Sequence, residues 1–264
     1  MPLAWLLGTR RKLLSQPVTA NELKLLDDAV WQARYLNSGL REKLARWVRV
    51  FISEKNWEGC NGQEINERIQ WTIASAAGLL VLAYDDWYYD RTQTILVYPA
   101  PYVATEDGRS GFATSTPIPA LMGEFPRAGQ TTYRGPVIVN WRDVVQASHG
   151  PNQGDHLAIH EFSHQLDMLN GPAADGLPPL PENINEGHWH KAFKREFEAA
   201  RSLVAQGHTI LMNDYSLSQE SEYFAVGSEY YFQQPTALSQ FHPQLFALLN
   251  DFYQLDLREL LPAT

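Results

Sequence analysis

The segment from His160 to Gly171 reads HEFSHQLDMLNG. It contains the pattern His-Glu-x-x-His at His160, Glu161 and His164. In an α-helix, residues four apart share a face, so two imidazoles can converge on one metal ion. Glu161 points about 100° away from His160 and can reach a water on that ion without being a ligand. The pattern therefore predicts one Zn²⁺ per chain as the cofactor.

The residues around this pattern favour a helix that presents both histidines on one side. In a chain with 8 His, the pattern is expected by chance on the order of 0.015 times. Asp155 is the expected N-cap, and Asn170-Gly171-Pro172 is a strong stop signal. An apolar stripe is expected opposite the histidines: Ala158, Phe162, Leu166 and Leu169. The alternative is an ordinary amphipathic helix whose two histidines bind no metal.

Asp167 lies on the same face as the histidines, three residues after His164. It can orient a ligand histidine through the second ring nitrogen, as acidic groups behind zinc sites often do. It can equally cap a segment or form a salt bridge elsewhere. The sequence leaves both roles open.

Catalytic zinc sites use three protein ligands and keep one position open. A third ligand is expected on the helix predicted over 217–233, which carries Glu220, Glu222 and Glu229. Glu222 and Glu229 share one face of that helix with the small residue Ala225, which would allow close approach to the first helix. Spacing alone narrows the ligand to Glu222 or Glu229, with Glu220 less favoured.

Outside these two helices, the pattern predicts further helices and a few strands. Amphipathic spacing indicates two helices over 21–55 broken at 37–39, and an apolar helix follows near 66–84. A β-rich stretch over 94–103 contains two prolines, which favours an edge strand. A long loop over 104–134 and a strand over 137–141, directly before the active helix, come next.

The C-terminal part is predicted to contain a loop over 171–187 and helices over 189–206, 217–233 and 242–254. Helices with few strands and no βαβ alternation indicate an α+β fold, mainly helical with a small β-sheet. The expected division is an N-terminal helical region, 1–90, and a catalytic domain, 91–264, which can pack together as one domain.

Composition limits the classes of function. The net charge of −9 argues against non-specific binding to nucleic acid or to an anionic membrane. Cys60 is the single cysteine, so no internal disulfide is possible. The apolar residues at 3–8 precede the basic residues at 10–12, the reverse of a secretory signal, and the longest uncharged apolar run, 69–84, is short for a membrane span. A cytoplasmic protein is expected.

Four separate motifs also occur together in a known family. They are YPAPYV (98–103), GPVIVNW (135–141), HEFSHQLDMLNG (160–171) and EYFAVGSEYYF (222–232). In this order they resemble the MtfA (Mlc titration factor A) family of bacterial zinc peptidases, over about residues 90–256. The N-terminal helices match only in general character. The family's catalytic part is similar to the peptidase domain of anthrax lethal factor, which implies a zincin-like fold for 91–264.

The resemblance implies roles for residues that spacing left open. It places the third metal ligand at Glu222, the residue that opens the Glu-x-Phe-Ala-like helix, with Tyr223 as the variable position. This ligand set is gluzincin-like. It implies that Tyr215, seven residues earlier, faces the active site. It places Glu229 behind the ligands rather than on the metal.

The function expected from these residues is hydrolysis of peptide bonds by a metal-activated water. Glu161 would be the general base, and Tyr215 would stabilise the oxyanion. The resemblance favours an aminopeptidase that acts on peptide or protein substrates. The alternative is a regulatory protein that sequesters a transcriptional repressor of sugar uptake, with or without proteolysis. A hydrolase for other amides or esters and a closed structural zinc site are less favoured.

Overall fold

The computed structural model describes residues 3–100, 102–104, 110–112, 135–151 and 154–261. Its α-helices are α1 Leu3–Ser15, α2 Ala20–Ala29, α3 Ser38–Glu54, α4 Glu67–Leu80, α6 Trp141–Ser148, α7 Leu157–Asp167, α8 Glu186–Ala205, α9 Glu220–Gln233, α10 Pro235–Phe241 and α11 Pro243–Tyr253. Short 3₁₀ helices are η1 Trp31–Tyr35, η3 Asp214–Leu217 and η4 Leu257–Glu259. The strands are β1 Asn56–Gly59, β2 Thr94–Tyr98, β3 Tyr102–Ala104, β4 Ser110–Phe112 and β5 Val137–Asn140. The mainly helical α+β fold is confirmed.

The main sheet has the order β1-β2-β5, and all its strands are parallel. Because α4 connects β1 to β2, the chain contains a βαβ unit, and the expected lack of βαβ alternation is wrong. The sequence hid this unit because β1 reads Asn-Trp-Glu-Gly, without the alternation that marks a strand. The expected edge strand is also wrong, since β2 is central and ends at Tyr98, before the first proline.

The region between β2 and α7 contains two further differences from the sequence prediction. Strands β3 and β4 pair as an antiparallel hairpin, and the rest of the predicted 104–134 loop lies outside the described residues. Strand β5 does not lead directly into the active helix, because α6 lies between them. Asn140 ends the strand and caps α6, accepting a hydrogen bond from the backbone N–H of Asp143 at 2.9 Å.

One cap and one proline explain where two other helices begin. Asn37 accepts a hydrogen bond from the backbone N–H of Leu40 at 3.0 Å, so α3 starts at the predicted break. The helix predicted over 242–254 is confirmed as α11, which Pro243 begins, and a further short helix that was not predicted, α10, precedes it. Proline fits the first turn of a helix but disrupts an interior, so the chain turns there.

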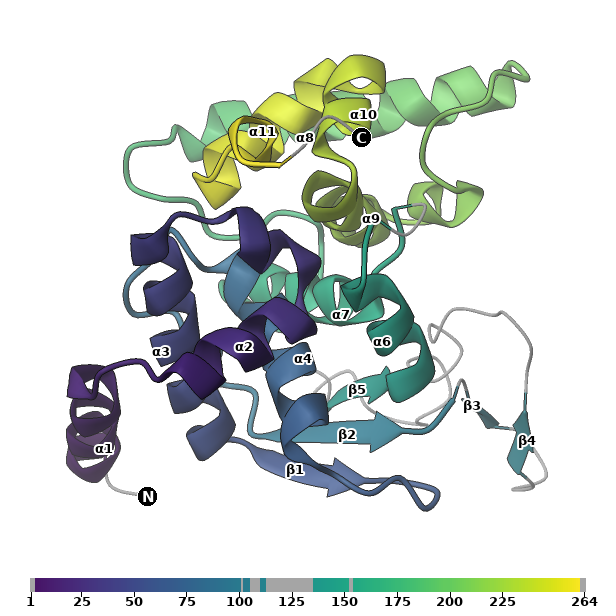
Figure 1. Ribbon diagram of the computed structural model, residues 1–264. Helices are drawn as coiled ribbons and strands as arrows, with labels where there is room; N and C mark the ends of the chain where they lie inside the picture. The colour runs from purple at the N-terminus through teal and green to yellow at the C-terminus, as the bar shows by residue number, and fades with distance from the viewer. Residues whose placement is uncertain (1–2, 101, 105–109, 113–134, 152–153, 262–264) are drawn as a thin grey trace.

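The elements form layers around a central helix pair. In Figure 1, α8, α10 and α11 lie on one side, the sheet lies on the opposite side, and α7 and α9 lie between them. Helices α7 and α9 pack against each other, and α4 packs between α3 and α7. The two helices with the candidate ligands are therefore held from several sides.

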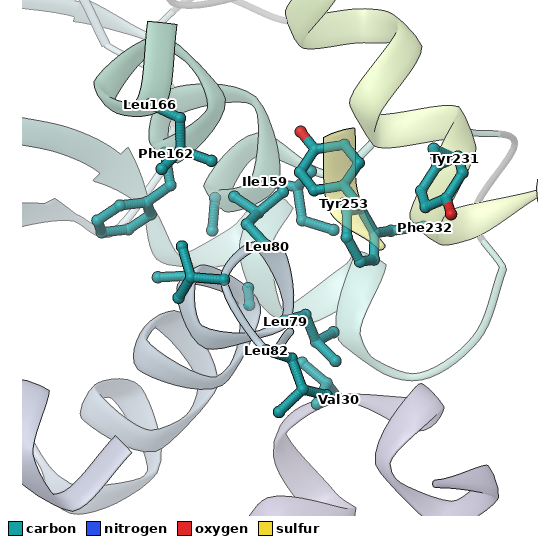
Figure 2. Packing of buried hydrophobic residues seen from close by; sticks show 14 of the residues in the cluster. Val30, Leu79, Leu80, Leu82, Ile159, Phe162, Leu166, Tyr231, Phe232 and Tyr253 are labelled. Atoms are coloured by element: carbon teal, nitrogen blue, oxygen red, sulfur yellow. The ribbon is translucent and has the colours of Figure 1, made fainter. Parts of the chain in front are cut away.

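One hydrophobic core joins the first and last parts of the chain. Figure 2 shows Val30, Leu80, Phe162 and Tyr253 in this core, from segments distant in sequence. Across the same region, the indole N–H of Trp31 donates to Gln233 Oε1 at 3.1 Å. The proposed boundary near residue 90 is therefore crossed by both apolar packing and a buried hydrogen bond.

Among the described residues, no helix is both long enough and apolar enough to span a bilayer. The apolar run that the sequence analysis singled out, 69–84, instead contributes most of α4, whose side chains from Trp71 to Leu80 are buried. Its apolar character is explained by burial in the core.

Candidate active site

The N-terminal end of α7 is fixed by His156 and not by Asp155, the expected cap. The Nδ1 atom of His156 accepts from the backbone N–H of Ile159 at 3.4 Å. Gly154, just before it, has φ +95°, and a Cβ there would lie 2.3 Å from the ring of Tyr230. Only glycine accommodates this backbone and this approach. The turn therefore sets where α7 begins against α9.

Three side chains from α7 and α9 converge on one point. His160 Nε2 lies 3.2 Å from His164 Nε2 and 3.2 Å from Glu222 Oε2. His164 Nε2 lies 3.5 Å from the same Glu222 oxygen. The exposed fractions of these three residues are 8%, 3% and 9%, so the group is buried in the fold. Together they could hold a metal ion.

These distances fit a zinc ion. Ligand atoms 2.0–2.1 Å from a tetrahedral zinc lie about 3.3 Å from one another. Glu222 Oε2 is buried and has no hydrogen-bond partner among the described residues, which an ion would supply. The charges of both histidines hold the pKa of the Glu222 carboxyl well below its usual range, although burial alone would raise it. With three ligands from the described residues, a fourth position stays available.

Glu229 lies behind His160. Its Oε1 accepts from His160 Nδ1 at 2.7 Å, and its Oε2 accepts from the backbone N–H of His156. With the ring proton on Nδ1, the Nε2 lone pair of His160 points at the common centre. Burial opposes charging of His160, but Glu229 and Glu222 raise its pKa well above the ordinary value in the metal-free protein. Glu229 therefore sets both tautomer and charge.

Glu161 lies next to this centre on α7 and is buried, with 8% of its surface exposed. Burial raises the pKa of its carboxyl, the two histidines lower it, and Glu222 and Glu229 raise it again, with a net upward shift. A carboxyl with a raised pKa is a better proton acceptor at neutral pH than an ordinary glutamate.

Tyr215 reaches the site from η3. Its ring centroid lies 6.4 Å from that of His160. Burial raises the pKa of the Tyr215 hydroxyl, and the charge of Glu222 raises it further. The hydroxyl therefore stays protonated and can donate a hydrogen bond at neutral pH.

Asp167 has partners away from the histidines. Its carboxylate accepts from the backbone N–H groups of Gly176 at 2.8 Å and Leu177 at 2.9 Å. His164 Nδ1, which Asp167 could have oriented, has no hydrogen-bond partner among the described residues. Of the two roles left open, the contacts match that of a cap on the 171–187 segment.

Gly176 brings that segment against the start of α9. It has φ +76°, and a Cβ there would lie 2.4 Å from the backbone oxygen of Glu220. The side chain of Glu220 points elsewhere, with its Oε2 3.6 Å from Lys194 Nζ of α8. Glu220 therefore takes part in the site only through its backbone, while Glu222, two residues later, faces the histidines.

His156 is the residue at the site that the sequence analysis missed. Histidine is an unusual N-cap, and Asp155 beside it is a common one, so local preference pointed to the wrong residue. Its contact with Glu229 depends on how α9 packs against α7, which no local pattern encodes.

Comparison with known proteins places the chain in a family. Residues 5–254 match the family described as glucose-regulated metallo-peptidase M90. The chain is 32% identical over 221 residues to Mlc titration factor A of Edwardsiella ictaluri. This match covers 82% of this chain and 80% of that protein. It is 29% identical over 248 residues to the protein of the same name in Salmonella gallinarum, covering 92% and 90%.

An uncharacterized protein of Synechocystis sp. is 27% identical over 254 residues, covering 96% of this chain and 90% of its own length. These matches include the N-terminal helices, where the motifs gave only a general likeness. The family match over nearly the whole chain agrees with a pair of histidines and a glutamate that could hold a metal ion. The chain belongs to the glucose-regulated M90 metallopeptidase family, which includes the relatives named Mlc titration factor A.

Proposed function

We propose that this metallopeptidase uses zinc to hydrolyse peptide bonds, and that it is an aminopeptidase. The proposal is carried by the triangle of His160, His164 and Glu222, whose edges of 3.2, 3.2 and 3.5 Å match a tetrahedral zinc. When bound there, zinc would act as a Lewis acid that acidifies water and polarises the scissile carbonyl.

Glu161 would remove the proton from the attacking water and transfer it to the leaving amine. Two observations support this role of Glu161: it follows His160 in the helix, and the pKa of its buried carboxyl is raised. Glu229 would keep His160 in the tautomer that leaves Nε2 free.

Tyr215 would donate a hydrogen bond to the oxyanion as the carbonyl becomes tetrahedral. Its protonated hydroxyl and its position over His160 support this role. Loss of one such donor typically costs about 2.7–4 kcal/mol of transition-state stabilisation. We expect Tyr215→Phe to lower kcat by about 10²–10³-fold while zinc content stays at one per chain.

Strand β5 would align an extended substrate. It is the last strand in the order β1-β2-β5, so among the described residues its outer edge has no partner strand. An extended peptide can add to such an edge through backbone hydrogen bonds. The strand also packs against α7, close to the proposed ligands.

The decisive experiment measures metal content and turnover together. Glu161→Gln should keep one zinc per chain in elemental analysis and lose hydrolysis of a peptide library. Glu222→Ala should lose most of the zinc. Full turnover by Glu161→Gln, or retention of stoichiometric zinc by Glu222→Ala, would refute these assignments.

Aminopeptidase activity has a separate test. Matched peptides with free and acetylated N-termini should be compared by mass spectrometry of the products. The proposal expects stepwise removal of N-terminal residues from the free peptide only. Cleavage of both peptides at internal bonds would show an endopeptidase, and cleavage of simple esters alone would show another hydrolase.

A regulatory role is the second candidate. Several relatives are named Mlc titration factor A. By this likeness the chain would bind a transcriptional repressor of sugar uptake, a role that does not need Glu161. Binding of such a repressor by the Glu161→Gln protein would separate this role from proteolysis.

A further inference from the structure

A cavity of about 350 Å³ lies among α2, α4 and the end of α6, and none of its lining residues is a candidate metal ligand. These helices pack against one another, as the lower half of Figure 1 shows. The volume lies in the range of small-molecule sites. The lining combines charged and apolar groups: Leu25, Asp28, Ala29, Arg34, Arg68, Trp71, Thr72 and His149.

The two arginines in this cavity lack acidic partners. Within the described part of the chain, neither Arg34 nor Arg68 has a carboxylate oxygen within 4.0 Å. The Nε–H of Arg34 donates to the backbone oxygen of Asp27 at 3.1 Å, and the guanidinium of Arg68 lies 5.7 Å from the centre of the Trp141 ring. Both guanidinium groups are solvent-exposed, and together with Asp28 they give the cavity lining one net positive charge in a chain of net charge −9.

Asp28 adds a negatively charged group to the same cavity. Its carboxylate forms no ion pair or hydrogen bond among the described residues, although it lines the same space as both arginines. A ligand with only negative charge would be repelled by Asp28. A ligand that also carries an amino or hydroxyl donor would satisfy it.

The remaining walls are suited to the body of such a ligand. Trp71 is 5% exposed and, with Leu25 and Ala29, gives an apolar wall. His149 uses Nδ1 on the backbone oxygen of Val145 at 2.6 Å, so its other ring nitrogen remains for a ligand. Polar groups at the edges of an apolar wall are the usual arrangement of a small-molecule site.

We propose that this cavity binds a small metabolite that carries one oxyanion group and at least one amino or hydroxyl donor. The oxyanion would lie between Arg34 and Arg68, and the donor would face Asp28. Guanidinium groups bind carboxylates and phosphates through paired N–H donors, so an amino acid and a phosphorylated polyol share the required chemistry. The site is separate from the metal centre and does not rest on the proposed peptidase activity.

Isothermal titration calorimetry of the full chain tests the site with three probes: inorganic phosphate, glycerol 3-phosphate and L-leucine. We expect saturable one-site binding of at least one of the two organic probes, which also identifies the source of the oxyanion. The double variant Arg34→Ala/Arg68→Ala should weaken that binding roughly ten- to hundredfold, because hydrogen bonds between charged groups are lost. Arg195→Ala, an arginine exposed on α8, is the matched control and should bind normally.

Asp28→Asn tests the acidic group of the cavity separately from the two arginines. It should weaken binding of the organic probe and strengthen binding of inorganic phosphate, because it removes both an acceptor and a repulsive charge. Thermal unfolding should show that each variant keeps the stability of the parent. Absence of binding by both organic probes, or binding unchanged in the double arginine variant, would overturn the proposal.

Discussion

The two ends of α7 are each held by a buried carboxylate, but the partners of the two carboxylates differ. At the N-terminal end, Glu229 accepts from the ring of His160 and from the backbone of His156. At the C-terminal end, Asp167 accepts from the backbone N–H groups of Gly176 and Leu177. Thus one carboxylate acts directly on a candidate ligand, and the other holds the segment whose Gly176 packs against the start of α9.

Because the partners differ, substitutions at the two ends of α7 should change different measured properties. Glu229 is one hydrogen bond from the proposed metal, so its loss should appear in metal affinity. Asp167 is linked to Glu222 only through the packing of Gly176 against Glu220, so its loss should appear in stability.

Gly176→Ala should give the largest effect because it disturbs the link between both helices. A Cβ would lie 2.4 Å from the backbone oxygen of Glu220, and alanine is strained at φ +76°. We expect a loss of about 2–5 kcal/mol in the free energy of unfolding, measured by urea denaturation. Gly171→Ala is the control, since a Cβ there meets nothing within 4 Å. Equal stability of the two variants would contradict the close approach.

The pH dependence of stability should report the Asp167 end. Burial raises the pKa of Asp167 to about 7, while its backbone donors partly oppose this shift. A raised folded-state pKa stabilises below the unfolded value of about 3.9, and this contribution is lost as the pH rises to about 7. Metal-free protein should therefore lose up to about 4 kcal/mol relative to Asp167→Asn across that window. If the parent and Asp167→Asn differ in free energy of unfolding by the same amount at every pH, the raised pKa of Asp167 is contradicted.

Glu229→Gln should weaken zinc binding about 10–100-fold, because a neutral amide accepts the Nδ1 proton of His160 less strongly than a carboxylate and leaves Nε2 a weaker metal donor. Competition with a chromogenic chelator measures this affinity. Glu182→Gln, in the segment before α8, is the matched control and should leave it unchanged. Zinc affinity equal to that of the parent would show that Glu229 does not act on the ligand.

Asp167→Asn should have the smallest effect on zinc, within about threefold, because the hydrogen bonds that Asp167 accepts come from the backbone of Gly176 and Leu177 rather than from a proposed ligand. Its effect on stability should instead be to remove the decline that the parent shows between about pH 4 and pH 7, because an amide does not titrate. The same chelator assay serves here. A loss of zinc as large as that of Glu229→Gln would erase the distinction between the two ends of α7.

The local features of the site were predictable from sequence because they depend on helical spacing. The His160 and His164 pair follows from residues four apart, and the expected packing of α9 on α7 is confirmed. The choice of Glu222 over Glu229 was not available from spacing, since both lie on one face. It depended on family likeness, and the geometry now places Glu222 Oε2 beside both histidines.

The features that sequence missed depend on distant contacts. Strand β1 exists because it pairs with β2, not because Asn-Trp-Glu-Gly prefers an extended chain. The cap at His156 was not predicted, because the partner of His156 is Glu229 on α9. The role of Asp167 stayed open, because its partner Gly176 lies in a loop. Helix α6 was missed because its eight residues are too few for a clear periodic pattern.

The division of the proposed ligands between α7 and α9 also makes the metal a cross-link. An ion held by His160, His164 and Glu222 would join two helices separated by the whole of α8. At a free zinc concentration a hundredfold above Kd, such binding adds about 2.7 kcal/mol to the native state. Amide hydrogen exchange in α9 would then slow with zinc occupancy, and zinc supply in the cell would govern how long each copy of the chain survives proteolytic turnover.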